Sequence, residues 1–201
     1  MKKKYERIRE HVAVLYGEER AQEIFDEIVE LIESVDIPAR EPHQWSEKDA
    51  LCITYADSIL GSDTPLESLH RFLTDHVGNL INTVHILPFY PYSSNDGFSV
   101  IDYEAVRHDL GSWDHVFAMS KNHRLVFDCV VNHVSQHSHY MQKYSEGHPD
   151  YENFFIEMDP DADVSTVTRP RTLPLLHEYE TRRGKKWLWT TFSEDQVDLN
   201  F

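Results

Sequence analysis

The sequence RLVFDCVVNHVS, residues 124–135, combines an apolar run with groups that can do chemistry. Its β-prone residues are typical of a strand that is buried on both faces, as in a parallel sheet. Asp128 interrupts the run, and Asn132 and His133 end it. Because an unpaired buried carboxylate is costly, Asp128 should have a cation or several donors beside it. Ligands bind at the carboxyl ends of strands in β/α folds, so the segment predicts a site, although turn residues and a structurally paired Asp128 explain it equally well.

Strands and helices alternate before this segment. The strands are predicted at residues 50–55 and 81–87, and the helices at residues 64–78 and 112–122. This order indicates a parallel sheet with right-handed crossovers. Both helices have start signals, which are a capping box with proline for the first and Ser112 for the second. Three apolar residues of the second helix should point inward: Trp113, Val116 and Phe117.

We interpret the chain as three parts. Residues 1–47 form an N-terminal extension of two amphipathic helices, followed by a linker that starts near residue 35 and contains two prolines. Residues 48–135 hold the three strands. Residues 136–201 lack strong periodicity and are too long for a simple loop, so we interpret them as a small inserted domain with a strand at residues 187–192.

The composition is that of a soluble globular protein, with 40% hydrophobic and 27% charged residues. The excess of 35 acidic over 19 basic side chains gives a net charge of −16, which disfavours nucleic acids and anionic membranes as partners. Cys52 and Cys129 lie in apolar runs, so we predict small buried thiols of a reducing compartment. We find no signal peptide and no apolar run near the roughly 18 residues that span a bilayer, and therefore predict a cytoplasmic protein.

The strand ends should bring several kinds of side chain to one mouth. They offer the carboxylate of Asp57, the amide of Asn95 beside Asp96, and the imidazole of His133, with aromatic residues nearby. Carboxylates and amides pair with hydroxyl groups, and the apolar face of a sugar ring packs on aromatic rings. The set therefore favours a polyhydroxylated ligand.

A metal site is the alternative for one histidine cluster. His133, His137 and His139 form an HxxxHxH pattern, but no HExxH motif or paired Cys/His spacing accompanies it. Hydrogen-bonded or solvent-facing histidines explain the pattern better, and we predict neither a metal ion nor another cofactor. A glycine-rich phosphate loop and a GxSxG nucleophile motif are also absent from the sequence.

The sequence DCVVNH at residues 128–133 resembles the first signature of the α-amylase superfamily of glycoside hydrolases and transglycosidases. Further segments are similar to its sucrose phosphorylase branch, which includes glucosylglycerate phosphorylases. They are ITYADSILG (53–61), VHILPFYPYSSNDGFSVIDY (84–103), LGSWDHV (110–116), RPR (169–171) and FSEDQVDLN (192–200). The resemblance implies an α/β fold, the (β/α)8 TIM barrel, with a small domain B inserted after strand three. This chain would hold the first three βα units of an incomplete barrel.

The resemblance also implies roles for residues that would contact the substrate. His133 would hydrogen-bond the glucosyl unit that reacts, and Phe98 and Phe192 would line its subsite. Arg171 and Gln196 would face the acceptor or phosphate side, where a guanidinium suits an oxyanion.

Other residues of the motifs would support the site or complete it. Asp128, with Asn132 beside it, would support the arginine of the family's second signature. The loop before Phe98 normally brings a carboxylate to the sugar hydroxyls. Here the aligned place holds Asn95, and Asp96 is adjacent, so either residue is a candidate for that contact.

Retaining α-glucosyl transfer is the chemistry that the resemblance implies. An Asp attacks the anomeric carbon, a Glu protonates the leaving group, and inorganic phosphate as co-substrate, or an acceptor hydroxyl, opens the glucosyl-enzyme. The family's Gly-x-Arg-Leu-Asp motif does not occur in the 201 residues, so we expect the nucleophile and the acid/base downstream of Phe201.

We therefore interpret the chain as the N-terminal fragment of a phosphorylase that acts on sucrose, glucosylglycerate or a related α-glucoside. A hydrolase of the same superfamily and an inactive sugar-binding remnant are the alternatives, and a homodimer is left open.

Overall fold

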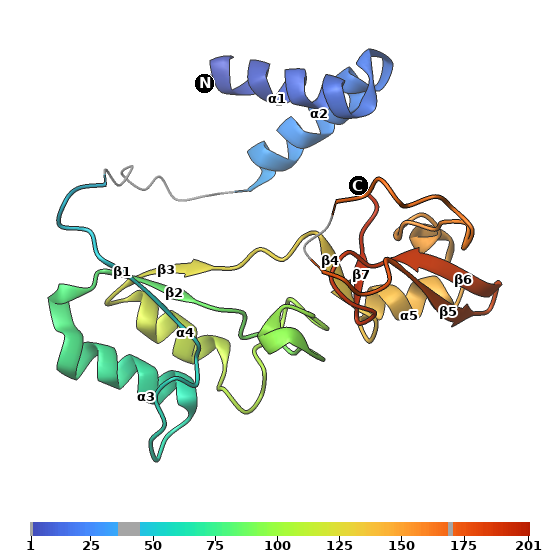
Figure 1. Cartoon of the computed structure of the whole chain (residues 1–201). Coiled ribbons are helices and arrows are strands. Elements are labelled where there is room, and N and C mark those ends of the chain that lie inside the picture. Colours follow the sequence, from blue (N-terminus) through green and yellow to red (C-terminus); the bar gives the residue numbers. More distant parts are fainter. Residues whose placement is uncertain (1, 36–44, 169–170) are drawn as a thin grey trace. The chain divides into compact units, whose positions relative to one another are not determined.

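The computed structural model describes residues 2–35, 45–168 and 171–201. It divides the chain into two compact units, Met1–Gln44 and Trp45–Phe201 (Figure 1). The predicted linker falls largely on residues 36–44, which lie outside the described residues.

The first unit is the predicted pair of helices, α1 (Lys2–Tyr16) and α2 (Glu18–Ser34). Gly17 joins them with a φ of 81°, a backbone conformation that glycine adopts without steric cost. Val12 and Ala21 are the buried residues of this unit. No helix in the described parts of the chain is both long and apolar enough to cross a bilayer.

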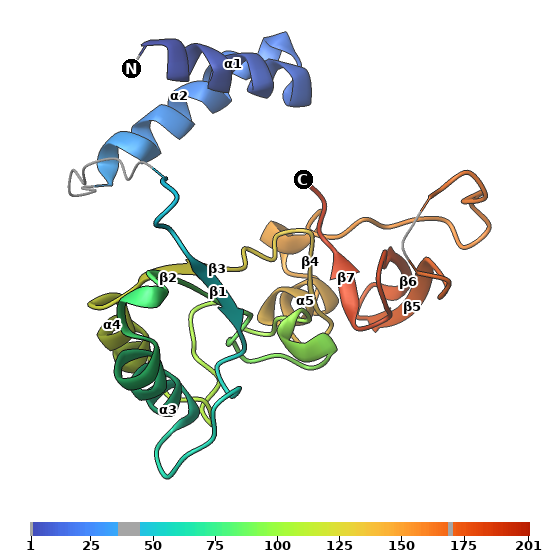
Figure 2. The same ribbon diagram turned by 60° about the vertical axis from the view of Figure 1, so that its left-hand side comes forward.

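The second unit starts with a three-stranded parallel sheet. Its strands are β1 (Leu51–Thr54), β2 (Thr83–Ile86) and β3 (Arg124–Phe127), in the order β1-β2-β3. Each strand begins within two residues of its predicted start, and the parallel pairing confirms the prediction drawn from the alternating elements. The sheet therefore gathers the three strand ends at one edge (Figure 2).

Two helices cover one face of this sheet, α3 (Pro65–Phe72) and α4 (Trp113–Ser120), and Figures 1 and 2 show both on the same side. After α3 the chain continues through a π-helical turn, η1 (Leu73–Val77), and a 3₁₀ turn, η2 (Gly78–Leu80). The buried core between helices and sheet consists of Ala56, Leu66, Leu69, Leu73, Val84, Ile86, Phe89, Leu110, Val116 and Met119.

The opposite face of the sheet is open in the described residues, which corrects our prediction that the third strand is buried on both faces. Leu51, Ile53 and Val126 stand on this face and are 46%, 60% and 38% exposed. β3 also ends at Phe127, so Asp128 begins a loop and does not interrupt a strand. Local sequence could not reveal this, because an apolar run predicts burial without saying which segment supplies the cover.

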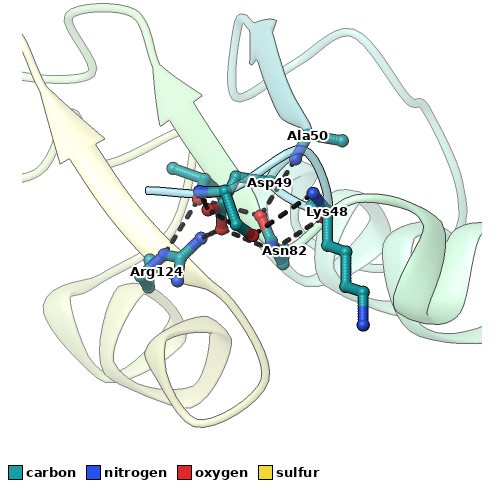
Figure 3. Close-up of polar contacts among 7 residues, drawn as sticks. Lys48, Asp49, Ala50, Asn82 and Arg124 are labelled. Carbon is teal, nitrogen blue, oxygen red and sulfur yellow. Dashed lines mark hydrogen bonds and ion pairs between the residues drawn. The ribbon is translucent and has the colours of Figure 1, made fainter. Parts of the chain in front are cut away.

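A polar cluster fixes the starts of the three strands (Figure 3). The carboxylate of Asp49 accepts hydrogen bonds from Arg124, from Asn82 Nδ2 at 2.9 Å and from the backbone of Ser46 at 2.7 Å. The pKa of Asp49 is held well below its usual value, first by the bond from Ser46 and then by Arg124 and Asn82. Arg124 also donates from Nε to Thr83 Oγ1 at 3.0 Å. The ionised carboxylate thus ties the segment before β1 to the residue before β2 and to the first residue of β3.

The helix starts agree with the sequence only in part. Pro65 takes the first position of α3 as predicted, but Thr64 makes no side-chain cap, and its buried hydroxyl has no partner among the described residues. Ser112 does cap α4, through a reciprocal contact with His115. Our prediction that Phe117 points inward is wrong, since its side chain is 61% exposed.

The C-terminal part of the second unit is built from short elements. They are β4 (His133–Ser135), α5 (His139–Ser145), the 3₁₀ turns η3 (Asn95–Gly97, in the earlier loop) and η4 (Pro149–Tyr151), β5 (Leu176–Thr181), β6 (Gly184–Trp189) and β7 (Gln196–Asp198). β4 pairs with β7 and β5 with β6, both antiparallel. The strand predicted at residues 187–192 starts and ends too late, because β6 begins at Gly184 and ends at Trp189. A second core holds Val134, Met141, Tyr144, Phe155, Tyr179, Leu188 and Val197.

The two cysteines are free thiols. Cys52 is half-buried on β1, whereas Cys129 is exposed. The prediction of a buried Cys129 is wrong because β3 ends two residues earlier, which places Cys129 on a loop.

Candidate functional site

A polar cavity of about 490 Å³ lies where the loops after β1, β2 and β3 meet β4 and β7. The nine residues to which the resemblance assigned a part in the site all line it: Asn95, Asp96, Phe98, Asp128, Asn132, His133, Arg171, Phe192 and Gln196. Tyr55, Cys129 and Val130 complete the lining. Asp57, whose carboxylate we predicted at the same mouth, lines a second cavity instead. The structure thus brings the nine residues together, while their contacts with a ligand stay predictions.

Asp128 is paired with His85, a residue that our sequence interpretation missed. His85 Nε2 lies 2.8 Å from Asp128 Oδ2, and both side chains are largely buried. Within the described residues, the group beside this carboxylate is an imidazole on β2. The contact of Asp128 with the arginine that the resemblance implies stays a prediction. A histidine in the middle of the apolar strand VHIL was the available signal.

His133 lies on β4 and is 5% exposed. Its Nε2 is 2.9 Å from the carbonyl oxygen of Phe98 and 2.8 Å from Nε2 of Gln196. The ring centroid is 5.1 Å from that of Phe192. Burial lowers the pKa of His133, and the Phe98 carbonyl and the Asp198 carboxylate offset only part of this effect. The imidazole is therefore kept in its neutral form near pH 7.

The loop of residues 93–99 carries three of the lining residues and has an unusual backbone. Asn95 and Asp96 both have left-handed φ values, 56° and 51°, which Asn and Asp tolerate better than other non-glycine residues. Gly97 follows with a φ of 101°, and a Cβ atom there would lie 2.6 Å from the carbonyl oxygen of Pro88. This close approach holds Asn95, Asp96 and Phe98 against the end of β2.

Asp195 anchors the 93–99 loop to the segment before β7, a role that our sequence interpretation did not assign to it. Its carboxylate accepts hydrogen bonds from Ser93 Oγ at 2.5 Å and from Ser94 Oγ, and its carbonyl oxygen accepts one from Ser99 Oγ at 2.9 Å. Burial alone would raise the pKa of Asp195, but the serine hydrogen bonds outweigh it and lower the pKa. The next residue along the chain is Gln196, so this anchor sets the distance between two sides of the cavity.

Arg171 and Asp96 are the exposed charged residues of the lining. Neither forms an ion pair with the parts of the chain that the structure describes. Two residues of the predicted RPR segment, 169 and 170, lie outside the described residues. An unpaired guanidinium beside a polar cavity can bind an oxyanion.

The histidine cluster does not form a metal-binding group. His133 is engaged with Phe98 and Gln196, while the ring of His139 packs on Tyr140 with centroids 3.8 Å apart. Throughout residues 2–35, 45–168 and 171–201, no group of three or more His, Cys, Asp or Glu side chains is arranged to hold a metal ion.

Comparison with known proteins identifies the family. Residues 76–201 match the model of the alpha-amylase catalytic domain, and the chain belongs to this family. It is 45% identical over 195 residues to glucosylglycerate phosphorylase of Allomeiothermus silvanus, a match that covers 96% of this chain and 35% of that protein. It is 33% identical over 161 residues to sucrose phosphorylase of Streptococcus mutans, covering 75% of this chain and 33% of that protein.

A solved structure shows the same fold. Sucrose 6F-phosphate phosphorylase from Thermoanaerobacter thermosaccharolyticum superposes with a TM-score of 0.69 at 28% identity, over 78% of this chain and 34% of that protein. The resemblance stated from the motifs is thereby confirmed. The chain spans about a third of the length of the curated relatives that it matches.

Proposed function

We propose that these residues form the glucose-facing part of a retaining α-glucoside phosphorylase. The enzyme would transfer the glucosyl unit of glucosylglycerate to inorganic phosphate. Glucosylglycerate is favoured over sucrose as the substrate because the identity to a glucosylglycerate phosphorylase is higher and extends over nearly the whole chain.

The observation that carries the proposal is the shared cavity. A neutral imidazole, His133, lines the cavity together with two aromatic residues, Phe98 and Phe192, and its ring contacts that of Phe192. Aromatic residues suit the apolar face of a pyranose, and the imidazole and amide groups suit its hydroxyls. The free charge of Arg171 suits phosphate or the carboxylate of glycerate.

We also propose that β1, β2 and β3 are the first strands of an eight-stranded barrel and that the β4–β7 region is the inserted domain. The open face of the sheet supports this, because parallel sheets are normally covered on both faces. In a closed barrel this face would point to the packed interior.

The two carboxylates of the lining do not serve as the catalytic pair in this proposal. Asp128 is engaged with His85, and Asp96 belongs to the substrate-binding loop. Residues beyond Phe201 would supply the nucleophile and the acid/base. The 201-residue chain by itself should therefore show no phosphorolysis of either glucoside.

A chimera tests the proposal. Residues 1–201 replace the corresponding third of the Allomeiothermus silvanus enzyme, and glucose 1-phosphate release from glucosylglycerate and phosphate is measured. We expect activity, and a loss of about a hundredfold in kcat/KM for His133→Ala, which corresponds to ~2.7 kcal/mol of transition-state stabilisation. His137→Ala is the control, since His137 is exposed and outside the cavity. A folded chimera without activity, or equal effects of the two variants, would refute the proposal.

A further inference from the structure

We propose that Asn95 is a positioning residue that sets the direction of the hydrogen bonds through Gln196 and thereby determines which ring nitrogen of His133 carries the proton. This inference deepens the proposed function, because it defines the hydrogen-bonding state of the imidazole in the glucose site. Its test does not depend on catalytic activity.

A continuous chain of contacts joins the three side chains. Asn95 Nδ2 donates to Oε1 of Gln196, and Ser193 Oγ donates to the same oxygen at 3.0 Å. The amide nitrogen of Gln196 is then left to face the Phe98 carbonyl at 3.3 Å and Nε2 of His133 at 2.8 Å. An amide NH₂ group only donates, so His133 Nε2 has to accept. A neutral ring that accepts at Nε2 carries its proton on Nδ1.

Burial makes the contact through Gln196 important for where the His133 proton lies. Gln196 and His133 are 3% and 5% exposed, so water cannot compensate for a wrongly directed bond. The Phe98 carbonyl, 2.9 Å from His133 Nε2, favours the opposite tautomer. His133 Nδ1 is buried and has no partner among the described residues, so it is unpaired in both tautomers.

Asn95 decides because of what an amide can do and a carboxylate cannot. As a donor it fixes Oε1 of Gln196 on its own side. A carboxylate at position 95 would accept only, and would draw the Gln196 NH₂ group toward itself. Oε1 would then face His133 Nε2, which would have to donate. Asp tolerates the left-handed φ of 56° about as well as Asn, so Asn95→Asp changes the hydrogen bonding without demanding a new backbone.

Several charged groups surround His133 and bear on its titration. Asp198 is its cross-strand partner on β7, and Asp198 accepts hydrogen bonds from the backbone of Thr191 at 2.9 Å and from Thr191 Oγ1 at 2.5 Å. The charged side chains that line the cavity with His133 are Asp96, Asp128 and Arg171. All of them remain in the Asn95→Asp variant, so a change in the proton position on His133 reports on position 95.

The test is ¹⁵N NMR of the 201-residue chain labelled at histidine, with the His133 signals assigned by their loss in His133→Gln. We expect the wild-type ring to be protonated at Nδ1 and unprotonated at Nε2. Asn95→Asp should move the proton to Nε2. Gln196→Glu should do the same, because its carboxylate accepts from both sides. Asn79→Asp adds the same charge at an exposed position outside the cavity and should change nothing.

Each result decides the proposal. A wild-type ring protonated at Nε2, or an Asn95→Asp ring that keeps the wild-type pattern, would overturn it. Should Asn95→Asp not fold, Gln196→Glu decides by the same criterion. These spectra are recorded on the 201-residue chain and do not depend on whether the chimera is active. Failure of this inference can therefore be distinguished from failure of the proposed function.

Discussion

Replacing Asp195 with alanine should detach the 93–99 loop from the segment that carries Gln196. The variant loses the carboxylate that accepts hydrogen bonds from Ser93 and Ser94. Hydrogen bonds to a charged acceptor contribute about 1.5–3 kcal/mol each when buried, so two would give about 3–6 kcal/mol. Asp195 is only half-buried, and water can replace part of the loss. We therefore expect a destabilisation of about 2–3 kcal/mol.

Urea unfolding of the full chain at pH 7, followed by tryptophan fluorescence, measures this loss. Glu194→Ala is the matched control, because Glu194 is exposed and its recorded contact with Tyr179 is made by its backbone carbonyl, which the substitution keeps. An Asp195→Ala variant within about 0.5 kcal/mol of wild type would refute the anchoring role, since exposed substitutions have effects of that size.

The stability that the Asp195 carboxylate contributes should depend on pH in a defined direction. The pKa of Asp195 is lowered in the folded chain, so the ionised carboxylate stabilises the fold fully above the unfolded value of about 3.9. This contribution is lost as the pH falls through the lower, folded-state pKa. The stability difference between wild type and Asp195→Asn should therefore shrink below about pH 4. A difference that stays constant down to pH 2 would show that the carboxylate charge does not matter.

Three further substitutions separate packing, backbone strain and ligand binding. Gly97→Ala brings a Cβ atom within 2.6 Å of the Pro88 carbonyl oxygen and should lower the free energy of unfolding in urea by about 2–4 kcal/mol. Gly184→Ala is the control, because Gly184 also has a positive φ but lies in open space, and it should cost only about 1 kcal/mol. Phe89→Ala removes a fully buried ring that contacts other aromatic rings, and should cost about 3–5 kcal/mol by the same measurement. In the chimera, Arg171→Ala should raise the KM for phosphate about tenfold or more, as expected for loss of one charge-assisted hydrogen bond, and an unchanged KM would remove Arg171 from the phosphate side.

The sheet could be predicted because its signals are local. β-prone residues mark β1, β2 and β3, and turn or capping residues such as Gly78 and Ser112 separate them from the helices. The alternation of strands and helices then allows few topologies, and the observed parallel sheet is the common one. The lining residues were found through recognisable motifs that lie at the ends of these strands.

The parts that were missed depend on partners distant in the chain. β5 has the sequence LHEYET, whose charged residues resemble a loop, and it becomes a strand by pairing with β6, where Lys185 lies 2.7 Å from Glu178. His85 and Asp128 are 43 positions apart, and Ser94 and Asp195 are 101 positions apart. No local periodicity encodes such contacts, because they appear only once the elements have packed.

The motif DCVVNH is divided between two sheets, and this explains why the strand prediction failed where the site begins. Asp128 follows β3 and is held by His85 of β2, which shares the open face of the sheet with Ile53 and Val126. His133 starts β4, pairs with Asp198 on β7 and directly precedes Val134 of the second core. A single long strand would have pointed these side chains to fixed, alternating faces. The break after Phe127 instead lets each side chain be positioned by its own neighbours, so that a carboxylate beside the parallel sheet and an imidazole on β4 line the same cavity.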